Sequence, residues 1–169
     1  RGLGDVYKRQ AWSYGRAESW NLLIPDFMGG DSGRAFTRDG EMAKALKPYG
    51  LESFAEQLPA YWGEQPYTAG PTYLGAAALF LALLGLLLAS GRNKWWIAAV
   101  SLLTLLLAWG HNFMGFTEFA FKYLPGYNKF RTVSMALVVV EWTVPLLAAL
   151  ALMPLWRGEV PRRKLLRAL

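Results

Sequence analysis

The most unusual ionisable residue in this sequence is Glu141, which interrupts a long apolar run. It lies eight residues into the run Val133–Trp156, which is roughly 12 Å along a helix at 1.5 Å per residue. Four residues later, Pro145 lacks the N–H that would bond the carbonyl of residue 141 and favours a kink. Glu141 and Pro145 therefore predict either a polar cavity that serves substrate or proton or a protonated carboxyl that bonds a neighbouring helix.

Two bases, Lys129 and Arg131, flank Phe130 just before the same run. Arginine binds phosphate oxygens through two parallel N–H groups, and lysine binds them as a point charge. The pair is a candidate site for the phosphate or pyrophosphate of an anionic lipid. The alternative is ordinary snorkelling of basic side chains at a membrane surface.

Asp26, Asp31 and Glu64 lie close in sequence to glycines and aromatic residues, including Trp62. A carboxylate accepts hydrogen bonds from sugar hydroxyls, and an aromatic face stacks on the apolar face of a sugar ring. These residues are therefore candidates for a sugar or acceptor site. The same mixture is also typical of an ordinary surface loop.

Several other chemistries are not supported by the sequence. The stretch Gly29–Arg34 lacks the Gly-Lys-Ser/Thr ending of a phosphate-binding loop, and Ser32 has no visible His and Asp partners. With no cysteine and only His111, no metal site is predicted and no cofactor is evident. The net charge of +6 comes mainly from basic clusters beside apolar runs and does not indicate nucleic-acid binding.

Three apolar runs must position these residues: Tyr73–Ser90, Trp95–Trp109 and Val133–Trp156. A transmembrane helix needs about 20 apolar residues. We therefore predict an all-α membrane protein with three transmembrane helices at about residues 73–90, 95–114 and 133–156. The alternative is a soluble bundle with buried helices.

The distribution of positive charge predicts the sidedness of these spans. Arg92 and Lys94 lie in the loop between the first two runs, and a basic tail occupies residues 157–169. The positive-inside rule places both in the cytoplasm. Residues 11–72 and 110–131 are then extracytoplasmic, and the protein is a multi-pass membrane protein with membrane lipid as its surroundings.

The outer region 11–72 is expected to be mostly helical. Helices are predicted at Tyr14–Ile24, at Glu41–Lys47 and at an amphipathic stretch from Leu51 to Leu58, which ends at Pro59. A further surface or re-entrant helix is expected between Phe113 and Tyr123.

The two ends of the sequence suggest a piece of a longer protein. Residues 1–10 resemble a non-native, adapter-derived segment, and the sequence stops at Leu169 inside a basic tail. We therefore expect an internal fragment whose spans pack against the rest of its own chain.

A set of motifs from residue 11 to about 160 resembles the YfhO-like family of bacterial polytopic membrane proteins. The motifs are Trp12–Gly15, Asn21–Phe27 followed by Gly29-Gly30, Tyr61–Tyr67, Gly70–Gly75 and Leu124–Met135. The resemblance implies kinship with C-type glycosyltransferases, which transfer sugar from a polyprenyl-phosphate carrier to a cell-envelope acceptor. It also implies a catalytic acid upstream of residue 11, so no catalytic residue is assigned within this sequence.

Three functional hypotheses follow. The first is a glycosyltransferase-like protein, in which Lys129 and Arg131 would hold the carrier phosphate. The second is a transporter or flippase for envelope precursors, which Glu141 and Pro145 motivate. The third is a membrane scaffold without chemistry of its own.

Overall fold

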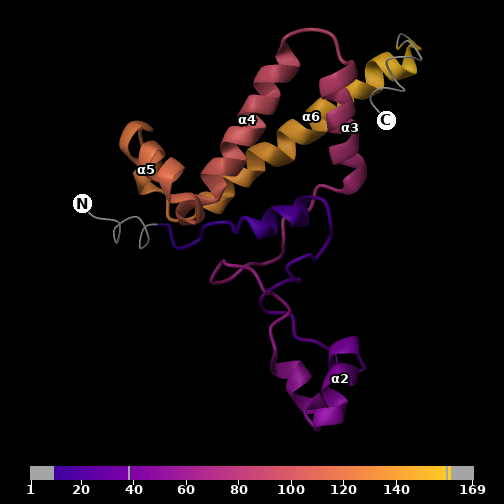
Figure 1. The fold of residues 1–169 in the computed structure, drawn as a ribbon, viewed down its shortest axis with the longest axis vertical. Helices are drawn as coiled ribbons and strands as arrows, with labels where there is room; N and C mark the ends of the chain where they lie inside the picture. Colours follow the sequence, from indigo (N-terminus) through magenta and orange to yellow (C-terminus); the bar gives the residue numbers. More distant parts are fainter. Residues whose placement is uncertain (1–9, 38, 159, 161–169) are drawn as a thin grey trace.

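The computed structural model describes residues 10–37, 39–158 and 160, and its three longest helices pack together (Figure 1). These are α3 (Ala76–Leu88), α4 (Asn93–Ala108) and α6 (Leu137–Trp156). Helix α6 packs along both α3 and α4, whereas α3 and α4 touch each other little. The described residues contain no strand, only two isolated β-bridges. The predicted all-α class is confirmed.

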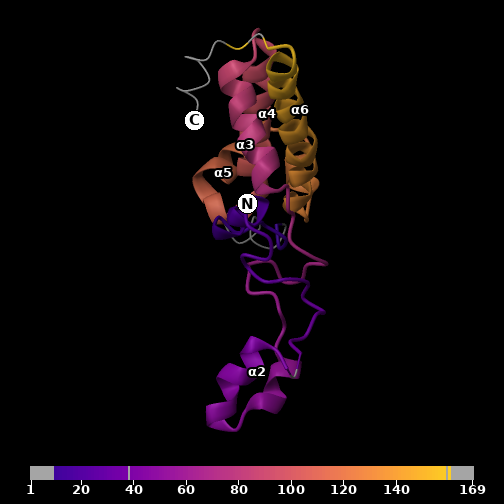
Figure 2. The same cartoon turned by 90° about the vertical axis from the view of Figure 1, so that its right-hand side faces the viewer.

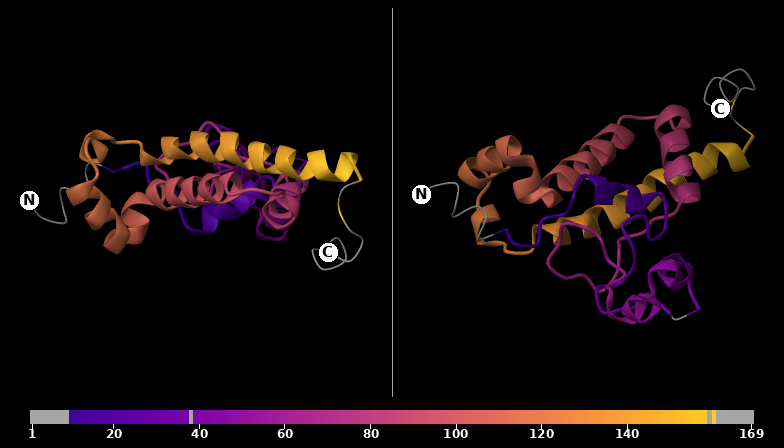
Figure 3. Two further views of the ribbon diagram at one scale, coloured as in Figure 1. Left: turned by 90° about the horizontal axis from the view of Figure 1, so that it is seen from above. Right: turned by 60° about the horizontal axis from the view of Figure 1, so that its bottom comes forward.

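The face that α6 turns to its neighbours is set by apolar residues three and four positions apart. Five buried side chains on this face are Leu137, Val140, Val144, Leu147 and Ala151. This spacing places them on one side of the helix. Figure 3, seen from above, shows α6 and α4 running side by side.

Gly85 of α3 lies at the closest approach to α6. A Cβ atom built on Gly85 would lie 2.0 Å from the carbonyl oxygen of Leu147 and 3.5 Å from the backbone nitrogen of Ala151. Only a residue without a side chain fits there. The crossing of α3 and α6 is therefore a small-residue contact of the kind that brings membrane helices together.

Only part of the predicted membrane topology is supported by helix length. Among the described residues, the segment Val133–Trp156 is long and apolar enough to cross a membrane, with 24 residues and a mean hydropathy of 2.1. Helix α3, with 13 residues, is shorter than the predicted span 73–90. Residues 73–75 and 89–90 of the predicted span lie outside the helix.

The predicted second span, residues 95–114, is not one straight helix. Helix α4 ends at Ala108, and the segment Gly110–Tyr123 leaves it at an angle of 109°. Gly110, with φ +47°, provides the bend, and a side chain there would collide with Ser13. The segment contains α5 (Met114–Tyr123), which agrees with the predicted surface or re-entrant helix. The bent pair could cross a membrane only as a broken span.

The outer region is less helical than the sequence suggested. It contains η1 (Ala17–Leu22), α2 (Glu41–Leu46), η2 (Lys47–Tyr49) and η3 (Glu52–Gln57), separated by turns and extended backbone. Three of these are 3₁₀ helices, which are short by nature. The expected α-helices at residues 14–24 and 51–58 are thus single 3₁₀ segments, while the helix expected at 41–47 is α2. Figure 2 shows α2 in a lobe away from the three long helices.

The remaining 3₁₀ helices connect the long helices. They are η4 (Gly110–Phe113), η5 (Tyr127–Lys129) and η6 (Val133–Ala136).

Residues 10–22 tie the outer region to the long helices. Tyr14 is 2% exposed within the main apolar core, and its N–H donates to the carbonyl of Ala108 at 2.8 Å. At the other end, the carbonyl of Leu22 accepts the N–H groups of Leu74 and Gly75, each at 3.2 Å. The outer region is thereby fixed at one end of the helical layer.

Candidate functional site

An apolar groove opens between α3 and α4, with α6 as its floor and η1 across one end. Its volume is about 510 Å³. The lining side chains from the helices are Leu79, Ala82, Leu83, Leu86, Ala98, Ser101, Leu102, Leu105, Val140, Val144 and Leu147, and those from η1 and the next residue are Ser19, Trp20, Leu22 and Leu23. The groove exists because α3 and α4 diverge while both pack on α6.

The few polar groups along this groove already have partners. The hydroxyl of Ser101 donates to Thr143 Oγ1 at 2.6 Å, and the hydroxyl oxygen of Ser19 accepts the indole N–H of Trp109 at 2.9 Å. An occupant of the groove therefore meets an almost wholly apolar wall. A hydrocarbon chain fits this surface, because apolar contact is all that the wall offers.

A second cavity, of mixed polarity, lies in the outer region. It has a volume of about 420 Å³, and its main side chains are Asp26, Phe27, Arg34, Phe36 and Trp62. The rings of Phe36 and Trp62 lie 6.3 Å apart. The cavity thus combines a carboxylate, a guanidinium and aromatic faces, a set suited to a sugar that carries an anionic group.

Two segments far apart in the sequence form the walls of this pocket. Antiparallel bridges join Gly29 to Tyr61 and Ala35 to Pro59. The N–H of Trp62 donates to the carbonyl of Met28 at 2.8 Å. At Gly29, with φ +81°, a Cβ atom would lie 1.6 Å from the carbonyl oxygen of Ala60, so glycine is required for the two segments to meet.

Asp26 is the one non-glycine residue with positive φ, at +52°, among the described residues. Aspartate tolerates this left-handed conformation better than most residues. Because such backbone outliers gather at ligand sites, the conformation of Asp26 adds weight to its candidate role.

One aromatic contact joins a lining residue of the groove to a lining residue of the pocket. Trp20 lines the groove and Phe27 lines the pocket. Their rings lie 6.4 Å apart. An amphiphilic ligand could thus place its hydrocarbon end in the groove and its polar end in the pocket on either side of this pair.

A buried carboxylate, Glu18, holds the outer region together. It is 1% exposed, and its two oxygens accept the N–H of Gly15 at 3.0 Å, the N–H of Glu64 at 2.7 Å and the side-chain amide of Gln65 at 3.3 Å. The hydroxyl of Tyr61 also donates to Glu18. Because Trp62 lies between Tyr61 and Glu64, this network sets the position of one pocket wall.

Burial raises the pKa of Tyr61 above its ordinary value, and its hydrogen bond to Glu18 raises the pKa further. Burial likewise raises the pKa of Tyr14, with a smaller contribution from the charge of Glu18. Both phenols therefore keep their protons at neutral pH. Tyr61 remains a donor to Glu18, and Tyr14 remains a donor to the carbonyl of Glu18 at 2.7 Å.

The structure brings together some of the sugar-site candidates predicted from the sequence. Asp26 and Trp62 line the same pocket. Asp31 instead accepts the N–H of Gly33 with its own carboxylate. Glu64 is exposed and contributes its backbone N–H to Glu18. Neither Asp31 nor Glu64 is a lining residue of the pocket.

The two phosphate candidates lie elsewhere. Lys129 ends η5, and Arg131 follows two residues later; both are exposed. The carbonyl of Arg131 accepts the N–H of Trp12 at 3.4 Å. Neither base lines the groove or the pocket, whereas Arg34 does line the pocket.

Glu141 and Pro145 are exposed on α6. Glu141 lies about a quarter turn around the helix from Val140, Val144 and Leu147, which form the groove floor, and neither Glu141 nor Pro145 lines the groove. The carboxyl of Glu141 therefore does not reach the groove.

Sequence reasoning missed Glu18 and Arg34. The sequence signal available for Arg34 was its place after the Gly29–Gly33 turn region, opposite an aromatic loop. Across the described ranges, with residues 1–9, 38, 159 and 161–169 outside them, no three His, Asp or Glu side chains are grouped so that they could hold a metal ion.

Comparison with known proteins gives no match to a family model, a curated protein or a solved structure. The YfhO-like resemblance consequently remains a prediction from the motifs, and the functional argument rests on the geometry of the groove and the pocket.

Proposed function

We propose that this chain is part of a bacterial inner-membrane protein that binds a polyprenyl-phosphate-linked sugar. In this proposal it acts as a glycosyltransferase-like protein that delivers the sugar to a cell-envelope acceptor. The observation that carries the proposal is the ring contact of Trp20, which lines the apolar groove, with Phe27, which lines the polar, aromatic pocket. A ligand with a long hydrocarbon chain and a polar head matches both halves.

The proposed membrane placement follows the charge pattern. Helices α3 and α6 and the bent pair α4–α5 would be three membrane segments, with residues 11–72 and 110–131 outside the cytoplasm. Figure 1 shows the α3–α4 turn and the C-terminal end of α6 on the side away from the outer region. Arg92 and Lys94 lie at that turn, and Arg157 follows α6. This arrangement supports a cytoplasmic position for all three bases.

Each part of the ligand has a proposed partner. The prenyl chain would lie in the groove, where van der Waals contact with the apolar wall would hold it, since a chain that comes from lipid gains little from the hydrophobic effect. Trp62 and Phe36 would contact the apolar face of the sugar, and Asp26 would accept its hydroxyl protons. Arg34 is the phosphate ligand that the pocket favours, and Lys129 with Arg131 are the alternative ligands at the outer end of α6.

Two adjacent leucines of α4 provide a matched test of the groove. Leu102 lines it and is 59% exposed, while Leu103 is 46% exposed and does not line it. Replacing Leu102 with Trp fills the groove without disturbing a buried side chain, and Leu103→Trp adds the same bulk elsewhere. In the purified full-length protein, we expect Leu102→Trp to weaken binding of a polyprenyl phosphate at least tenfold and Leu103→Trp to leave it within twofold. Equal affinities for the two variants would refute the groove as the chain-binding site.

A transporter is the second candidate, and Glu141 with Pro145 still motivates it. In that case Glu141→Gln should abolish movement of the lipid-linked precursor across a vesicle membrane while leaving its binding intact. A scaffold without chemistry would show neither binding nor transport.

A further inference from the structure

The side of α6 that turns away from α3 and α4 carries an exposed stripe along the whole helix. Its members, alternately four and three residues apart, are Val138, Trp142, Pro145, Ala149, Leu152 and Trp156. This is the spacing of a helix that packs lengthwise against another helix. We refer to these six residues as the outer stripe.

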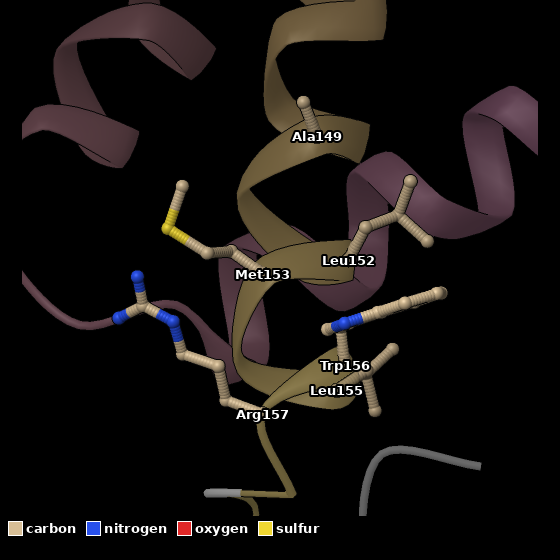
Figure 4. A pocket seen from close by; sticks show the side chains of 6 residues that line it. All are labelled: Ala149, Leu152, Met153, Leu155, Trp156 and Arg157. Atoms are coloured by element: carbon tan, nitrogen blue, oxygen red, sulfur yellow. The ribbon is translucent and has the colours of Figure 1, made fainter.

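Two small residues lie in the middle of the outer stripe, between larger residues on either side. Trp142 is 78% exposed and Trp156 is 94% exposed, while Pro145 and Ala149 between them have little bulk. Figure 4 shows the short side chain of Ala149 above Leu152, Met153 and Trp156. All four residues help to line a hollow of about 710 Å³. A surface of knobs and hollows suits the interlocking side chains of a partner helix.

Glu141 lies directly beside Trp142 and is also exposed. Among residues 10–37, 39–158 and 160, no hydrogen bond or ion pair reaches its carboxyl. An acid that faces hydrocarbon is costly even on permissive scales. Pro145 also leaves the carbonyl of Glu141 without its usual donor. The carboxyl therefore lacks a hydrogen-bond partner, and lipid cannot supply one.

We propose that the outer stripe packs against a further membrane-spanning helix of different sequence, and that this helix presents a basic or amide side chain to Glu141. A second copy of this chain is disfavoured. A two-fold axis would bring Glu141 against Glu141 at the same depth, where two ionised carboxylates repel each other and could pair only after taking up a proton. The proposal rests on the membrane placement of α6 given above, but not on the ligand of the groove.

A photoreactive side chain placed on the stripe tests this contact. In the full-length protein in native membranes, we expect p-benzoylphenylalanine in place of Trp142 to cross-link to another apolar helix. The cross-linked peptide should contain a basic or amide side chain. The same group in place of Leu103 of α4, which is exposed off the stripe, should react with lipid. Lipid adducts alone at position 142, or a cross-link only to α6 of a second copy, would overturn the proposal.

The sign of a stability change gives a second, independent test. If Glu141 bonds a basic or amide side chain of a partner helix, Glu141→Leu leaves that side chain unpaired. The substitution should then lower the melting temperature of the membrane-embedded protein by several degrees, and Glu141→Gln should lower it less. If Glu141 faces lipid, Glu141→Leu removes a cost and raises the melting temperature, which contradicts the proposal. Recovery of the protein in the aqueous fraction would instead refute the membrane placement itself.

Discussion

At the scale of single residues, Glu18 organises the part of the molecule where the polar pocket forms. Its carboxylate joins the turn at Gly15 to the loop from Tyr61 to Gln65, more than 40 residues away in the sequence. A buried carboxylate with several donors is stable only while those donors remain in place. Glu18 is therefore a positioning residue for Trp62.

Removing the Glu18 carboxylate should destabilise the protein. Glu18→Ala leaves several buried donors unpaired, at a cost of about 3 kcal/mol. In a chain of this size that cost corresponds to a fall in melting temperature of roughly 10 °C. Glu41→Gln, which removes a charge from the exposed pair with Lys44, is the control and should shift the melting temperature by less than about 2 °C. Equal shifts for the two variants would contradict the role of Glu18.

The choice between Arg34 and the Lys129–Arg131 pair is also decided by single residues. Only Arg34 shares a pocket with Asp26 and Trp62. We expect Arg34→Gln to weaken binding of a polyprenyl phosphate about tenfold, in line with the loss of one charge-assisted hydrogen bond. Replacing both Lys129 and Arg131 with Gln should change it less than threefold. A larger loss of binding for the Lys129 and Arg131 double variant than for Arg34→Gln would instead place the phosphate site at the outer end of α6.

At the scale of helices, the crossing of α3 and α6 depends on Gly85. Because the backbone of α6 lies where a side chain would go, even Gly85→Ala must push the helices apart. The expected cost is about 2 kcal/mol, measured as a loss of melting temperature in detergent or lipid. Gly115→Ala on α5 is the matched control, because a Cβ atom there has no neighbour within 4 Å. A Gly85→Ala protein as stable as the Gly115→Ala protein would show that the two helices are not so closely packed.

Helix positions were the most predictable feature of this fold. The apolar runs locate α3, α4 and α6, because long uncharged stretches have few other stable arrangements. The bend after α4 was not predicted at Gly110, since it depends on the approach of Ser13 from almost 100 residues earlier. The 3₁₀ form of η1 and η3 was also missed, because periodicity alone does not separate short 3₁₀ segments from α-helices.

At the scale of the whole molecule, the candidate site forms where segments distant in the sequence pack against one another. Asp26 and Trp62 were predictable as sugar-binding residue types, and the structure places them together. The groove was not predictable, because its walls come from three helices and from the 3₁₀ helix that crosses their end. Glu18 gave no sequence signal, because its partners are specified only once residues 61–65 fold against residues 15–18.

Binding of the prenyl chain in the groove is the central claim, and a photoreactive polyprenyl phosphate bound to the full-length protein tests it most directly. With the reactive group on the prenyl chain, the account predicts adducts on Leu83 of α3 and Leu102 of α4, which line the groove. It predicts none on Leu87 and Leu103, which are exposed on the same two helices but lie outside the groove. Labelling spread equally over these four leucines, or confined to Leu87 and Leu103, would contradict the claim.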